Sequence, residues 1–204
     1  MSARRAEVNR KTNETQIACR LVIDGEGKAA VVTGIGFLDH LLTALTRFAH
    51  FDLFLECHGD LPVDDHHTAE DCALVFGAAL DQALGERRGI ARFGYAYAPL
   101  DESLARAVID FSGRPFAQID LGLTRETLGQ LDEHGVGQLA AENIPHLLHS
   151  LAMAARATLH VDVLRGQNDH HRAEAAFKAV GLALRAAAQV DGEGDVPSTK
   201  GVLG

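Results

Sequence analysis

Two short segments of the 204-residue chain carry the same pair of adjacent histidines followed by a glutamate. The first is DDHHTAED at 64–71, and the second is NDHHRAEA at 168–175. On a helix, a glutamate three or four residues after a histidine lies beside it, and adjacent side chains point about 100° apart. Imidazole and carboxylate groups both bind first-row transition metals. Each segment therefore predicts a helix start that presents metal ligands in two directions.

The similarity extends well beyond this motif. Residues 65–84 and 169–188 are identical at nine of twenty aligned positions, including Gly77. Upstream, His40 precedes the first pair by 26 residues and His146 precedes the second pair by 24 residues. Chance surface histidines would not recur with a matching upstream partner. The pattern therefore indicates a duplicated unit that binds metal.

The duplicated positions supply six imidazoles and two carboxylates, which suit two metal ions with about four protein ligands each. Zinc, iron and nickel are common in imidazole-rich sites, so the residues alone do not select the metal. The predicted ligands are His40, His66, His67, Glu70, His146, His170, His171 and Glu174. Five histidines lack a duplicated partner and are expected to be structural, namely His50, His58, His134, His149 and His160.

Each repeat predicts β-strands followed by a helix, a strand and a helix. Apolar residues at helical spacing predict helices at 37–49, 65–84, 144–157 and 170–188, with Gly85 as a C-cap. Alternation and β-rich composition predict strands at 14–24, 28–33, 51–59, 103–113, 115–122 and 158–166. We expect an α+β fold of two duplicated units, 1–92 and 93–190, with sheets covered by helices. A Gly-rich, irregular arm follows at 191–204.

Composition limits the partners of the chain. The net charge of −9 and pI of about 5.6 argue against a nucleic-acid partner, and no apolar run is long enough to span a membrane. Three cysteines without a pairing pattern and the absence of a secretory signal predict a cytoplasmic protein. A small anion could still be held by local basic and hydroxyl groups. The candidates are Arg92, Arg114, Lys178, Ser198, Thr199 and Lys200.

The chain resembles the imidazoleglycerol-phosphate dehydratase family of histidine biosynthesis. The matching segments occur in order along nearly the whole chain: GIGFLDHLL, DDHHTAED, PLDESLARAVIDFSGRP, NIPHLLHSLA, NDHHRAEAAFKA and PSTKGVL. The resemblance implies two duplicated units related to the ribosomal protein S5 domain 2-like fold. It also implies two Mn(II) ions per active site and a homo-oligomer of 24 subunits built from trimers, with the sites between subunits.

The resemblance further implies a carbon–oxygen hydro-lyase that converts D-erythro-imidazoleglycerol phosphate to imidazole acetol phosphate and water. The metal ligands it implies are the eight positions of the repeat, and Glu14 in NETQI would contact the substrate. Our mechanistic hypothesis is that the substrate ring binds as an imidazolate and expels the neighbouring hydroxyl. Catalytic proton transfer would fall to Glu14, Glu70, Glu174, His67 or His171. The basic and hydroxyl candidates would hold the phosphate, with the arm completing the substrate site.

Two other functions fit the same ligands. A dinuclear metallohydrolase of a small phosphate ester would release inorganic phosphate by attack of metal-activated water. A non-enzymatic metal-binding assembly would bind metal without turnover, and it would give no role to Lys200. The product formed from imidazoleglycerol phosphate distinguishes the three.

Overall fold

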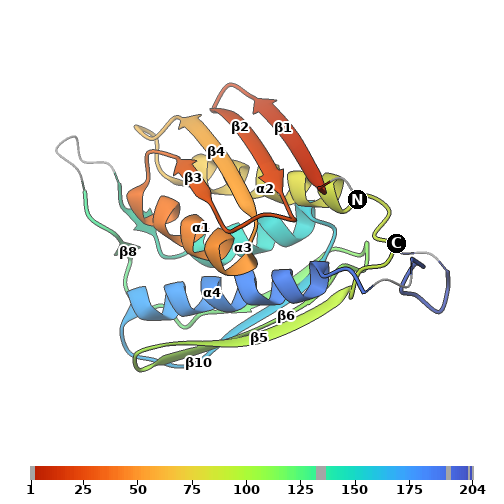
Figure 1. The fold of residues 1–204 in the computed structure, drawn as a ribbon. Helices are drawn as coiled ribbons and strands as arrows, with labels where there is room; N and C mark the ends of the chain where they lie inside the picture. Colours follow the sequence, from red (N-terminus) through yellow and green to blue (C-terminus); the bar gives the residue numbers. More distant parts are fainter. Residues whose placement is uncertain (1–2, 132–136, 192–193, 202, 204) are drawn as a thin grey trace.

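Two four-stranded sheets enclose four helices in the computed structural model (Figure 1). The model describes the chain except residues 1–2, 132–136, 192–193, 202 and 204, so His134 and part of the arm lie outside the described residues. No helix in the described part of the chain is long and apolar enough to cross a membrane.

The first sheet belongs to the N-terminal unit and has the strand order β1-β2-β4-β3. In β2, alternate residues from Thr15 to Leu21 are buried, which is the pattern of a strand with one face on the core. Strand β3 pairs parallel with β4, and the other pairings are antiparallel. The elements are β1 (Arg5–Lys11), β2 (Thr15–Val22), β3 (Ala29–Val32), α1 (Gly36–Ala49), β4 (Asp52–Gly59) and α2 (His66–Leu84).

The second sheet repeats this plan with the order β5-β6-β10-β7, in which β7 pairs parallel with β10. A short hairpin of β8 (Thr127–Leu128) and β9 (Leu139–Ala140) is added before the third helix. The predicted α+β class with duplicated units is confirmed. The remaining elements are β5 (Phe93–Leu100), β6 (Ser103–Asp110), β7 (Phe116–Asp120), α3 (Asn143–Ala154), β10 (Thr158–Arg165) and α4 (Asp169–Ala188).

The structure differs from the sequence-based prediction at strands β1, β5, β8 and β9, which the prediction missed, and at the end of α3. Strands β1 and β5 are edge strands: β1 has no fully buried residue, and the aromatic side chains of β5 are exposed. Helix α3 ends at Ala154 rather than at residue 157 because Arg156 has a left-handed φ of 51°. That turn leads the chain into β10.

The helices pack across the two units, α1 against α4 and α2 against α3. The duplicated glycines lie at these contacts. A Cβ atom added at Gly77 of α2 would lie 2.6 Å from the carbonyl oxygen of Leu151 in α3. A Cβ atom at Gly181 of α4 would clash in the same way with the carbonyl oxygen of Leu45 in α1. Glycine at both positions therefore permits close approach of helices from different units.

Candidate metal centre

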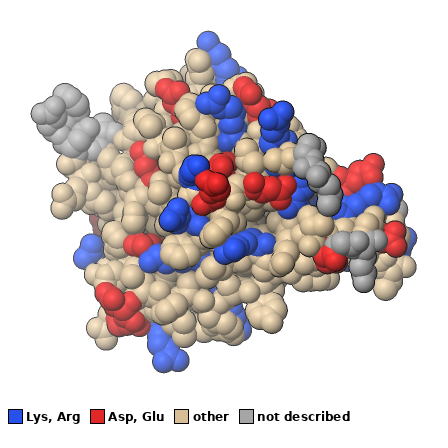
Figure 2. All heavy atoms as spheres, in the orientation of Figure 1, with Lys and Arg blue, Asp and Glu red and all other residues tan. Residues whose placement is uncertain are grey.

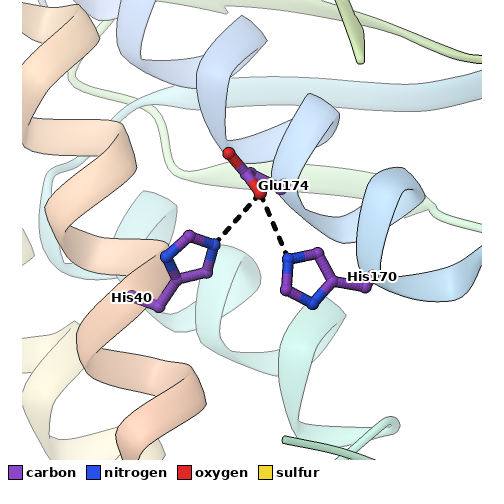
Figure 3. Close-up of side chains that lie close together, drawn as sticks. All are labelled: His40, His170 and Glu174. Carbon is purple, nitrogen blue, oxygen red and sulfur yellow. Dashed lines mark hydrogen bonds and ion pairs between the residues drawn. The ribbon is translucent and has the colours of Figure 1, made fainter. Parts of the chain in front are cut away.

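One ligand cluster joins α1 and α4 (Figure 3). An Oε2 atom of Glu174 lies 3.1 Å from His40 Nε2 and 3.2 Å from His170 Nε2. His170 and Glu174 are one helical turn apart on α4. The side chain of Asn168 accepts a hydrogen bond from the His170 backbone N–H and so caps the helix where the motif begins.

The second cluster joins α2 and α3 in the same arrangement. The carboxylate of Glu70 lies 3.7 Å from His66 Nε2 and 3.3 Å from His146 Nε2. The rings of His66 and His146 stack with centroids 5.0 Å apart. Each cluster thus combines a helix start from one unit with the upstream histidine of the other unit.

The donor atoms fit a metal ion. In each cluster, the ligand atoms all lie within 4.8 Å of one another, and two imidazoles with one carboxylate suit a first-row metal with open positions. His146 Nε2 is buried and has no hydrogen-bond partner among the described residues, which a bound cation would remedy. Burial acts to raise the pKa of Glu174, but its contacts with Lys178 and His40 outweigh burial and lower the pKa. This carboxylate is therefore ionised near neutral pH, as a ligand must be.

His67 and His171 belong to neither cluster. Their Nδ1 atoms contact carboxylates instead, Asp60 at 3.0 Å from His67 and Glu102 at 2.8 Å from His171. These hydrogen bonds raise the pKa of both imidazoles. Among the described residues, the Nε2 atom of His67 lies 3.7 Å from Glu14, and that of His171 lies 3.9 Å from Asp101. The structure thus brings six of the eight predicted ligands into two groups of three, and it leaves these two histidines outside them.

The polar residues that orient the histidines did not emerge from the sequence. The Oδ1 atom of Asn143 lies 3.0 Å from His66 Nδ1. Asp60 and Glu102 make the equivalent contacts with Nδ1 of His67 and His171. One signal for Glu102 exists in the repeat: Glu102 directly precedes β6, as Glu14 directly precedes the corresponding β2. A comparison of the residues before β2 and β6 could therefore have identified Glu102.

The aspartate that opens each repeated motif holds the long segment before α3. An oxygen of Asp169 accepts hydrogen bonds from the backbone N–H groups of Thr124 and Arg125, at 2.8 and 2.7 Å. Asp65 accepts from the backbone N–H of Ala140 and from the side chain of Asn143. The two aspartates therefore fix both ends of the segment that leads to His146.

The predicted anion-binding residues fall into separate places. Lys178 lies beside the first cluster, with its Nζ atom 2.9 Å from Glu174. Arg92 forms two hydrogen bonds with Asp110 and donates another, 2.8 Å long, to the carbonyl of Pro197 in the arm. The backbone N–H of Arg92 donates a hydrogen bond to the carbonyl oxygen of Ala187 in α4. Ala187 follows Lys178 by nine residues, which is about 14 Å along the helix.

Arg114, Ser198, Thr199 and Lys200 lie in turns. The Arg114 backbone N–H donates to Ser112 Oγ in the turn after β6. In the arm, the N–H of Lys200 donates to Ser198 Oγ, and a Gly201-to-Ser198 backbone bond encloses Thr199. On the face drawn in Figure 2, Lys and Arg side chains are interspersed with Asp and Glu. Within one chain, Lys178 in the middle of α4 is thus separated from the arm, which follows the C-terminal end of this helix.

The chain is similar to known proteins of one family. Residues 33–184 match the family model described as imidazoleglycerol-phosphate dehydratase. Proteins of that name from Candida glabrata and Schizosaccharomyces pombe are 52% and 50% identical to this chain, over 97% and 98% of it and 99% and 100% of their own lengths. One from Phytophthora nicotianae is 56% identical over 98% of this chain, which spans 42% of that longer protein.

Two solved structures are also similar. The imidazoleglycerol-phosphate dehydratase of Staphylococcus aureus superposes with a TM-score of 0.79 at 33% identity, covering 91% of this chain and 99% of its own. The Pyrococcus furiosus protein, in complex with (S)-C348, gives a TM-score of 0.79 at 36% identity, with 96% and 100% covered.

Proposed function

Because the chain belongs to the imidazoleglycerol-phosphate dehydratase family, hydro-lyases of histidine biosynthesis, we propose that it dehydrates D-erythro-imidazoleglycerol phosphate to imidazole acetol phosphate at a centre with two Mn(II) ions. The observation that carries the metal part of this proposal is the pair of equivalent clusters, each with two imidazoles and a glutamate. One ion would be held by His40, His170 and Glu174, and the other by His66, Glu70 and His146.

Bound cations would supply Lewis-acid polarisation of the substrate's imidazole ring, which has no neighbouring carbonyl to accept electrons. The protein residues hold the ring and move protons. Glu14 and Glu102 directly precede β2 and β6. Glu14 is half-exposed and lies 3.7 Å from Nε2 of His67, whereas Glu102 accepts several hydrogen bonds. Glu14 is therefore our candidate base for the carbon-bound proton. Glu70, Glu174, His67 and His171 are the further candidates for proton transfer.

We propose that neighbouring copies complete each site. The side chains of His67 and His171 are 31% and 28% exposed and lie outside the clusters of their own chain, so each can serve as the fourth ligand in another copy. The separation of Lys178 from Arg92 also fits a substrate site built from more than one chain. Arg114, Ser198, Thr199, Lys200 and the arm at 191–204 would then hold the phosphate across a subunit boundary.

The outer face of the second sheet supports self-association. Three aromatic side chains of β5 share this face with Phe116, which lies in the same row across the sheet. They are half to three-quarters exposed, so they offer roughly 100 Å² each, about half of what one partner contributes to a standard interface. The corresponding positions of β1 are Arg5, Glu7 and Asn9. The aromatic residues are Phe93, Tyr95, Tyr97 and Phe116.

We therefore propose the homo-oligomer implied by the resemblance, 24 subunits built from trimers. A cytoplasmic location is proposed with it, since Cys19, Cys57 and Cys72 are free and buried, as suits a reducing compartment. The units 1–92 and 93–190 remain our proposed division of the chain.

The test combines elemental analysis with turnover of imidazoleglycerol phosphate. We expect two manganese ions per chain and a keto product that retains its phosphate. Release of inorganic phosphate would support a metallohydrolase instead. Metal binding without turnover would support a metal-binding assembly.

A further inference from the structure

Glu102 contacts both the start of α4 and one of its histidines. Its Oε1 atom accepts hydrogen bonds from the backbone N–H groups of Gln167 and Asn168, at 3.1 and 2.9 Å. Its Oε2 atom lies 2.8 Å from Nδ1 of His171. An ionised carboxylate can only accept hydrogen bonds, and two backbone N–H groups donate to this one.

A carboxylate acceptor fixes the tautomer of a neutral imidazole. Because Glu102 accepts at Nδ1, the ring proton lies on Nδ1 and the lone pair lies on Nε2. We propose that Glu102 is a positioning residue that holds His171 in the Nδ1–H form, so that Nε2 is available as a metal ligand. This inference rests on the proposed function, in which His171 binds a metal in a neighbouring copy. Carboxylate partners on the second ring nitrogen are the usual means of orienting such ligands.

The first unit supports the inference because a non-corresponding residue makes the carboxylate contact at Nδ1 of His67. The counterpart of Glu102 is Glu14, which faces Nε2 of His67 rather than Nδ1. The Nδ1 contact of His67 comes from Asp60, in the turn after β4. An inherited loop contact would use corresponding residues in both units. Non-corresponding carboxylates at the same ring atom point to a requirement for the Nδ1–H form itself.

The alternative role for Glu102 is purely structural, through the backbone bonds of its Oε1 atom. Glu102→Gln separates the two roles. The amide oxygen can still accept from Gln167 and Asn168, but the amide NH₂ then faces His171 Nδ1 as a donor. His171 would have to place its proton on Nε2, where it blocks metal binding. The fold is retained while the tautomer is reversed.

The experiment uses the full chain and two readouts. The first is Mn(II) affinity, which we expect Glu102→Gln to weaken 10- to 100-fold at one of the two ions, with an unchanged melting temperature. The second is the ¹⁵N spectrum of the histidine-labelled, metal-free chain at alkaline pH, where the imidazole is neutral. There the protonated nitrogen of His171 should change from Nδ1 to Nε2, with the signal assigned by its loss in His171→Ala.

Glu56→Gln is the matched control, because it removes the same charge beside His58, which is not a predicted ligand. It should leave both readouts unchanged. The inference is overturned if Glu102→Gln keeps the Nδ1–H signal, whatever happens to metal affinity, or if Glu56→Gln weakens Mn(II) equally. A wild-type chain that binds no Mn(II) refutes the proposed function separately, since the tautomer of His171 is measured without metal.

Discussion

Gly77→Ala tests whether close helix contact between the units positions the metal ligands. A methyl group at Gly77 would lie 2.6 Å from the Leu151 carbonyl oxygen and 2.7 Å from Ala154 Cβ. Ordinary contacts begin near 3.4 Å, so α2 and α3 would separate by about 0.8 Å at this point. The contact lies about two helical turns beyond Glu70 and His146 on the two helices.

Two energies oppose each other in this variant. Overpacking of a helix contact costs about 1–3 kcal/mol, whereas Gly-to-Ala in a helix recovers about 1 kcal/mol of propensity. The net loss of about 0–2 kcal/mol leaves the chain folded. Metal sites tolerate ligand displacements of only about 0.2 Å, so a shift of about 0.8 Å between Glu70 and His146 should abolish strong binding at the second cluster.

The assay is metal content per chain after dialysis, measured beside thermal unfolding. We expect Gly77→Ala to retain one of two metal ions, with His40, His170 and Glu174 unaffected. Gly181→Ala should remove the other ion, because its methyl group meets α1. Gly36→Ala is the control, since nothing lies within 4 Å of its added Cβ. Two tightly bound ions in Gly77→Ala would refute the reasoning.

Other perturbations have equally direct outcomes. His67→Ala or His171→Ala should lower metal content and the size seen by gel filtration; unchanged values in either variant would contradict ligand sharing between copies. Because hydrogen bonds raise the pKa of both histidines, protons compete with the metal more strongly than at a free imidazole, and titration should show metal release beginning above about pH 6.5 as the pH falls. In the metal-free chain the same contacts stabilise the fold below about pH 6.5, and unfolding should show that contribution lost as the pH rises through the raised pKa values. Lys200→Ala and Arg92→Ala should raise KM for imidazoleglycerol phosphate at least 10-fold and leave metal content unchanged, since both would act on the phosphate; an unaltered KM would exclude that role.

Much of the fold follows from local pattern. The four helices and six of the strands have apolar residues that identify them, and the helices and the central strands β2, β4, β6 and β10 bury one face against the core. Strand β1 could not be identified this way, since most of the residues in its sequence RAEVNRK are polar. The exposed aromatic residues of β5 gave no alternation with polar residues either. Both strands form by pairing with β2 or β6, and their own residues do not show this pairing.

The candidate site was also predictable only where its residues are close in sequence. His170 and Glu174 could be paired from sequence because four residues make one helical turn. The partner of this pair is His40, 134 residues from Glu174, and only the packing of α1 on α4 identifies it. The contacts of Asp60 with His67 and of Glu102 with His171 were likewise not predictable, because these carboxylates lie in loops that approach the motif only in the folded chain.

The exchange of histidines between the units has a consequence for the origin of the chain. A half-length ancestor with one motif and one upstream histidine could not have assembled either cluster from its own residues. Two such molecules, paired about a twofold axis so that each donated its histidine to the other, would have formed both clusters at once. Metal binding would then have preceded the fusion of the halves, and covalent linkage would have made a dependence on concentration unnecessary.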